Sequence, residues 1–139
     1  MLTFKRLDLE DAGRLIAGAR AHARSIGVPV CIAVTDESGN LIAFERMDGS
    51  KVTSINLAID KSYTATGIKN GTDVLGTVSQ PGQPAYGISS TLGGRMLTIA
   101  GGLPVLSEGE VVGGIGVSSG TPAQDLQIAQ AGVQAFTDV

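Results

Sequence analysis

The sequence has no tryptophan, one cysteine and one histidine, and only 4% of its 139 residues are aromatic. The single cysteine, Cys31, excludes a disulfide within the chain and fits a reducing compartment, so we expect a cytoplasmic protein. A structural zinc site needs a cluster of cysteines and histidines that this composition does not supply. The scarcity of aromatic rings also argues against a stacking platform for nucleic-acid bases.

Charge of one sign is not concentrated anywhere in the chain. The net charge is −3, and the lysines and arginines are scattered, which argues against nucleic acid or an anionic membrane as a partner. The longest apolar run, near residues 28–34, is too short to cross a bilayer. With 42% apolar residues, the length fits one globular domain over residues 1–139. Glycine is abundant, with 20 residues, which predicts tight turns and close backbone approaches.

The pattern of apolar residues predicts an α+β domain. Helical spacing occurs over residues 8–26, 54–68 and 121–136, with a short helical piece at 72–78. Strands are expected at 30–34, 41–46, 96–100, 104–106 and 111–118. Hairpin turns at 36–40 and 107–110, without βαβ alternation, favour an antiparallel sheet with helices packed on it.

Four motifs, in order over nearly the whole chain, resemble those of one family. Residues 34–49 resemble the family's "V-x-D-x-x-G-x-L … R-M-D-G", and residues 61–65, which read K-S-Y-T-A, resemble its "K-A-Y-T-A". Residues 101–105 resemble its "G-G-x-P" turn, and residues 113–118 with 124–125 resemble its closing "G-x-I-G-V-S-G … Q-D". The sequence is therefore similar to the GlcG/HbpS-like family, sometimes labelled haem-degrading, which includes the C-terminal domain of PduO-type proteins. The resemblance implies a profilin-like fold, with a five-stranded antiparallel sheet and helices packed on both faces. It also implies a homo-oligomer and a small-molecule ligand, since some members bind haem or free iron.

His22, the only histidine, lies on the first expected helix, where haem-binding relatives carry a histidine. An imidazole nitrogen is a good donor to iron, so the resemblance makes His22 the candidate metal ligand of a haem site. The alternative is a surface histidine between Ala21 and Ala23. Cys31 lies within an apolar run, so we expect a buried structural thiol.

Lys61 is the second candidate, because helical spacing places it on a partly apolar face with Thr64. A lysine there can hold a carboxylate ligand, or act as a base if burial lowers its pKa. The alternative is an ion pair with Asp36 or Asp48 that ties the helix to the first hairpin.

Two further groups come from loops at the ends of strands, where binding residues gather. Arg46 and Asp48 offer a guanidinium and a carboxylate to a pocket rim; alternatively, Asp48 only caps backbone N–H groups of the turn. Gly101 and Gly102 can present backbone N–H groups to an anionic ligand, or form only a sharp bend.

Three functions remain open from the sequence. The first is a small-ligand-binding protein, with haem or one of its degradation products as the leading ligand. The second is a small catabolic enzyme acting on an organic acid by proton transfer, deamination or hydrolysis, which requires Asp36, Arg46, Asp48 and Lys61 to converge near one hairpin. The third is an accessory protein that uses residues 81–94 as an interface loop. No recognised catalytic signature decides whether the chain is an enzyme.

Overall fold

In the computed structural model, which describes residues 1–137, four antiparallel strands form one sheet in the order β2–β1–β4–β3. The strands are β1 (Cys31–Asp36), β2 (Leu41–Arg46), β3 (Gly102–Ser107) and β4 (Glu110–Ser118). β1 and β4 lie at the centre, and every residue of β1 is buried, as its apolar sequence requires. The two hairpins, β1–β2 and β3–β4, are therefore joined by the pairing of their buried strands β1 and β4.

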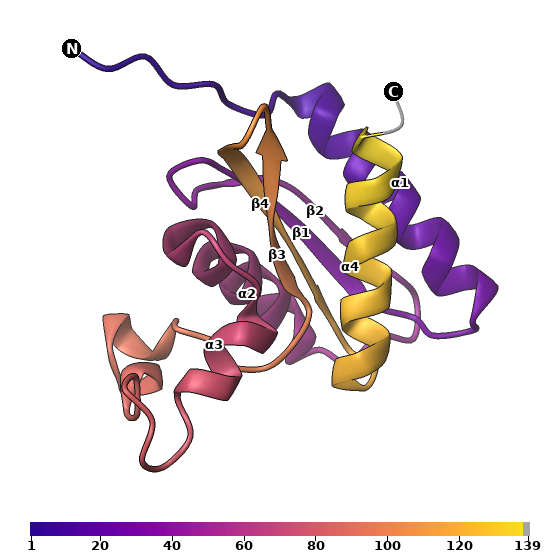
Figure 1. Cartoon of the computed structure of the whole chain (residues 1–139). Coiled ribbons are helices and arrows are strands. Elements are labelled where there is room, and N and C mark those ends of the chain that lie inside the picture. Colours follow the sequence, from indigo (N-terminus) through magenta and orange to yellow (C-terminus); the bar gives the residue numbers. More distant parts are fainter. Residues whose placement is uncertain (138–139) are drawn as a thin grey trace.

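Helices cover both faces of this sheet. They are α1 (Leu9–Ser25), α2 (Ser54–Ile68), α3 (Thr72–Val78) and α4 (Pro122–Thr137). Figure 1 shows α1 and α4 together on one side of the sheet, and α2 with α3 on the other. The predicted α+β class, and the predicted placement of helices on both faces, are confirmed.

Side-chain hydrogen bonds fix where the two long outer helices begin. Asp8 accepts from the backbone N–H of Asp11 at 2.8 Å, and the Asp11 carboxylate accepts from the backbone N–H of Asp8 at 3.1 Å. Thr121 and Gln124 form the equivalent reciprocal pair at the start of α4. Each pair satisfies backbone donors that the first turn of a helix leaves without a partner.

The two faces of the sheet are packed differently. Leu15, Ile32, Ile115 and Ile128 belong to a large apolar core between the sheet, α1 and α4. On the other face, α2 presents small and hydroxyl side chains: Thr35 of β1 lies 2.7 Å from the Ser62 hydroxyl and 3.1 Å from that of Thr66. Helix α2 therefore lies close to the strands, and a buried network of hydroxyl groups joins it to β1.

The expected strand at 96–100 is wrong, and so is the five-stranded sheet implied by the resemblance, because residues 1–137 contain four strands. The Thr64 hydroxyl donates to the carbonyl of Arg95 at 2.9 Å and accepts from the N–H of Leu97 at 3.0 Å. The segment is therefore held against α2 rather than paired with a strand. The expected edge strand at 104–106 lies inside β3.

Candidate functional site

A buried ion pair between α2 and α4 forms the centre of the candidate site. Lys61 Nζ lies 3.1 Å from Asp125 Oδ2, and both side chains are only 3% exposed. The ammonium also donates to the carbonyl of Val117, in β4, at 2.9 Å. Gly101 packs over the pair, because a Cβ at this position would lie 2.9 Å from Nζ. The predicted pairing of Lys61 with Asp36 or Asp48 is therefore wrong.

Burial has the largest effect on the electrostatics of this pair. Desolvation lowers the pKa of Lys61 and raises the pKa of Asp125, while the attraction between the two charges opposes both shifts. The Asp125 carboxylate also accepts the backbone N–H of Gly120 at 2.9 Å. The two groups are consequently closer in proton affinity than a lysine and an aspartate in water.

The Lys61 cleft, a cavity of about 300 Å³ beside the ion pair, opens between the first turns of α2 and α4. It is lined by Lys51, Thr53, Ser54, Leu57, Lys61, Ile99, Ser118, Ser119, Gly120, Pro122 and Asp125. The Ser118 hydroxyl donates to that of Ser54 at 3.1 Å, and the backbone N–H of Lys51 donates to the Ser119 hydroxyl at 2.9 Å. The cleft thus combines the charged pair Lys61–Asp125 at its base, several hydroxyl groups, and an apolar side formed by Leu57, Ile99 and Pro122.

Thr64 and Gly102 have structural roles beside this cleft. The Thr64 hydroxyl is occupied by the backbone of residues 95 and 97, as described above. The N–H of Gly102 donates to the Thr72 hydroxyl at 2.9 Å, so the predicted presentation of this N–H to an anion is wrong. A Cβ on Gly102 would overlap the backbone carbonyl of Lys61, which explains why glycine is required there.

Asp36 lies at the turn of the β1–β2 hairpin, away from the Lys61 cleft. Its Oδ1 atom accepts the backbone N–H groups of Ser38 and Asn40, both at 2.9 Å, and its Oδ2 atom is 3.8 Å from Arg6 Nε. These bonds close the turn. Asp36 is therefore a turn residue in this structure.

Arg46 and Asp48 follow the opposite end of the same hairpin. Together with Arg24, Glu45 and Met47 they line a second hollow of about 320 Å³. Asp48 is exposed and caps no backbone N–H group within residues 1–137. The expected convergence of Asp36, Arg46 and Asp48 with Lys61 is wrong, because none of the three lines the Lys61 cleft.

His22 is half-buried on α1, one turn after Gly18, on the face that packs against Ala131 and Ala135 of α4. Its Nε2 atom is buried and has no hydrogen-bond partner in the part of the chain that the structure describes. Buried polar atoms are normally hydrogen-bonded, so an orphaned ring nitrogen is unusual. A group of three or more His, Cys, Asp or Glu side chains able to hold a bare metal ion is absent from residues 1–137.

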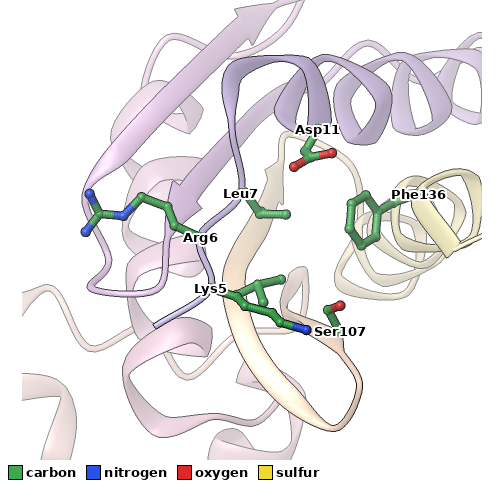
Figure 2. Close-up of a pocket in the computed structure, with 7 residues that line it drawn as sticks. Lys5, Arg6, Leu7, Asp11, Ser107 and Phe136 are labelled. Atoms are coloured by element: carbon green, nitrogen blue, oxygen red, sulfur yellow. The ribbon is translucent and has the colours of Figure 1, made fainter. Parts of the chain in front are cut away.

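A third hollow, of about 310 Å³, lies between the N-terminal segment, the first turn of α1 and the end of α4 (Figure 2). Leu7 and Phe136 face into it, whereas the Arg6 guanidinium points away, toward Glu37. Lys5 pairs with Glu108, and Asp11 with Arg14. Since its charged side chains already have partners, this hollow offers little charge to a ligand.

The most important site residue that the sequence interpretation missed is Asp125. It stands in the "Q-D" pair of the closing motif, and this was the available signal, but no local pattern connects it with a lysine 64 positions earlier. Ser54, Ser118 and Ser119 were also left out of the predicted site, because a serine is too common to indicate a site by itself.

The fold and the cleft define a small α+β domain with a polar pocket where helices on opposite faces of the sheet begin. A family model described as haem degrading protein HbpS-like matches residues 7–134, and the chain belongs to this family. Protein ORFY of Klebsiella pneumoniae superimposes with a TM-score of 0.98, at 33% identity, over 100% of this chain and 96% of that chain.

Two further relatives cover similar shares of the chain. The structure of a PduOC–haem complex gives a TM-score of 0.90 at 35% identity, over 94% of each chain. A 15.0 kDa protein of Citrobacter freundii, from the dhaT–dhaS intergenic region, is 36% identical over 96% of this chain and 94% of its own length. Among residues 1–137, no helix has both the length and the apolar character needed to span a bilayer.

Proposed function

We propose that this protein binds a small molecule, and that haem or a product of haem degradation is the leading ligand. The observation that carries the proposal is the orphaned Nε2 atom of His22, which is a donor of the type that haem iron takes. The haem complex of the PduOC relative supports the same ligand class.

His22 is the residue of α1 that would hold the group, through its Nε2 atom. Arg24 and Arg46 line a hollow that does not include His22, and Arg24, two residues further along the helix, faces another direction. Bound haem would supply the redox and ligand-binding chemistry of its iron. The protein's own contribution would be to hold and orient the imidazole.

A hemin titration followed by Soret absorbance tests the proposal on wild type and on His22→Ala. We expect a saturable shift at one hemin per chain in wild type, its loss in His22→Ala, and its return when free imidazole is added. Tyr86→Phe is the matched control, since Tyr86 is an exposed side chain of a type that also binds haem iron. The absence of a saturable shift in wild type, or an unchanged shift in His22→Ala, would remove haem from the proposal.

We further infer a cytoplasmic homo-oligomer. The resemblance to the family supports the assembly, and the exposed apolar side chains of Leu2, Phe4 and Leu106 support it physically. The buried free thiol of Cys31 suits a reducing compartment. Light scattering gives the number of 14.1 kDa chains in the particle, and one chain per particle would contradict the assembly.

A further inference from the structure

We propose that the Lys61 cleft is a second binding site, which takes a small carboxylate with a short apolar body. The cleft lies at the first turns of α2 and α4, and His22 does not line it. The proposal is therefore independent of haem binding and goes beyond it.

The cleft holds hydrogen-bond donors that the described part of the chain leaves unused. An ammonium carries three N–H groups, and Lys61 uses two of them, on Val117 and Asp125. The Ser54 hydroxyl accepts from Ser118 and the Ser119 hydroxyl accepts from the backbone, and within residues 1–137 neither donates its own hydrogen. These unused donors favour a ligand that only accepts hydrogen bonds.

Both oxygens of the acidic side chain in the cleft already accept a hydrogen bond from the chain. Asp125 Oδ2 accepts from Lys61, and Oδ1 accepts from the backbone N–H of Gly120. The chain thus holds the Asp125 carboxylate in place. The carboxylate orients the Lys61 ammonium and does not itself bind the ligand. An ionised carboxylate is a small group that accepts without donating, and its hydrogen bonds to charged and hydroxyl donors are strong ones.

The charge of the cleft is positive on balance. Lys51 and Lys61 line it together with one acidic side chain, Asp125. Both α2 and α4 also begin there, and the positive ends of helix dipoles add a favourable field for an anion. An acid bound in the cleft would therefore be held as its anion.

The apolar wall and the volume limit the size of the ligand. Leu57, Ile99 and Pro122 form the apolar part of the lining, and the cavity measures about 300 Å³. This volume is at the lower end for sites that bind small molecules. A short aliphatic acid fits these dimensions, and a large polyanion does not.

The buried ion pair is poorly explained by stability alone. Taking two charges out of water costs nearly as much as their attraction returns, so replacing such a pair by neutral groups is often harmless to the fold. A pair that only joined two helices would be expected in a sealed interior. Here it borders an open cleft, which matches a binding role.

Amide-detected NMR titration with butyrate, and with its neutral isostere butyramide, tests the proposal on the full chain. We expect saturable shifts for the amides of Gly101, Ser119 and Gly120 with a dissociation constant on the order of 1 mM, which is ordinary for a ligand of a few atoms. Butyramide should bind at least about tenfold more weakly, because it lacks the charge. Inorganic phosphate, which lacks the apolar body, should compete poorly.

Two double variants separate the cleft from general charge effects. Lys61→Met/Asp125→Asn removes the buried pair at constant net charge, and butyrate affinity should fall at least about tenfold. Lys5→Met/Glu108→Gln removes an exposed pair elsewhere, again at constant net charge, and should leave the affinity unchanged.

Three results would overturn the assignment: no saturable shift in wild type, equal responses to butyrate, butyramide and phosphate, or full affinity in the Lys61→Met/Asp125→Asn variant. The first two need no variant, so the test stands even if the cleft variant folds poorly. A failed hemin titration would leave this assignment untouched.

Discussion

Arg6 and Glu37 form a two-pronged contact at the first hairpin, with Nε–Oε2 and Nη2–Oε1 distances of 2.7 and 2.6 Å. The hydrogen bonds from Arg6 are the largest influence on Glu37 and lower its pKa from 4.5 to about 2. Because the pKa in the folded protein is the lower one, this carboxylate contributes stability above about pH 4.5. The contribution is lost as the pH falls through about 2.

Replacing Arg6 by Gln should return the pKa of Glu37 toward 4.5, measured by carboxyl-carbon NMR titration. The urea midpoint of the variant should lie slightly below that of wild type at pH 7, because Arg6 is more than half exposed and water screens the pair. The two midpoints should converge toward pH 2, where Glu37 is protonated in both proteins. An unchanged Glu37 titration would contradict the prediction, and Arg14→Gln serves as a control that leaves Glu37 paired.

Lys61 and His22 differ in how far the sequence alone predicts their surroundings. Helical spacing was sufficient to predict that Lys61 lies on a partly apolar face, because spacing along a helix is local information. Its partner was mispredicted, because pairing with Asp125 depends on how the last helix returns to the sheet. The orphaned nitrogen of His22 likewise depends on packing against α4, which no local pattern contains.

At the scale of elements, α2 and β4 approach so closely that their backbones set the spacing. A Cβ on Gly116 would overlap the carbonyl oxygen of Ala58 and lie 2.6 Å from the backbone nitrogen of Ser62. Gly114 is similarly covered by Ser62 and Thr66. These glycines are therefore required by contact with a helix, which accounts for their otherwise costly presence in a strand.

Gly116→Ala should lower the free energy of unfolding by about 1–3 kcal/mol or more, since an added methyl group must displace packed backbone. Gly13→Ala is the matched control on α1, where a Cβ meets nothing within 4 Å. It should raise stability by up to about 1 kcal/mol, the helix propensity difference between the two residues. Urea unfolding of both variants checks the pair, and equal effects would show that the close approach is not a constraint.

The helices and hairpins were predictable because apolar periodicity, caps and turn residues agree in each of them. The segment 96–100 was misassigned for a physical reason. Its short run of apolar residues resembles a strand, but the hydroxyl of Thr64 supplies hydrogen bonds that a neighbouring strand would have supplied. A side chain 33 positions away is invisible to a local pattern.

At the scale of the whole molecule, the Lys61–Asp125 pair joins the two layers of helices. Lys61 belongs to α2 and Asp125 to α4, and these helices lie on opposite sides of the sheet (Figure 1). The two side chains pair at 3.1 Å, and Lys61 also donates to the carbonyl of Val117 near the end of β4. The pair therefore spans the end of the sheet. Removing one partner leaves a buried charge, whereas removing both leaves two neutral groups of similar size.

Lys61→Met alone should lower the free energy of unfolding by about 3–5 kcal/mol, because it leaves the buried carboxylate of Asp125 without its positive partner. Lys61→Met/Asp125→Asn should recover most of that loss, since the amide oxygen can still accept from Gly120. Urea unfolding of the single and double variants measures the coupling. Additive losses in the double variant would show that the two groups do not act as a pair.

The backbone contact between α2 and β4 also decides where this protein can change its sequence. On the α1–α4 face, side chains fill the space, so a larger residue at one position can be balanced by a smaller residue at another. On the α2 face no such exchange is available, because main-chain atoms already touch. Substitutions that alter ligand preference can therefore accumulate in the core between the sheet, α1 and α4, and around the opening of the Lys61 cleft. The distance from Lys61 to Val117 stays fixed meanwhile.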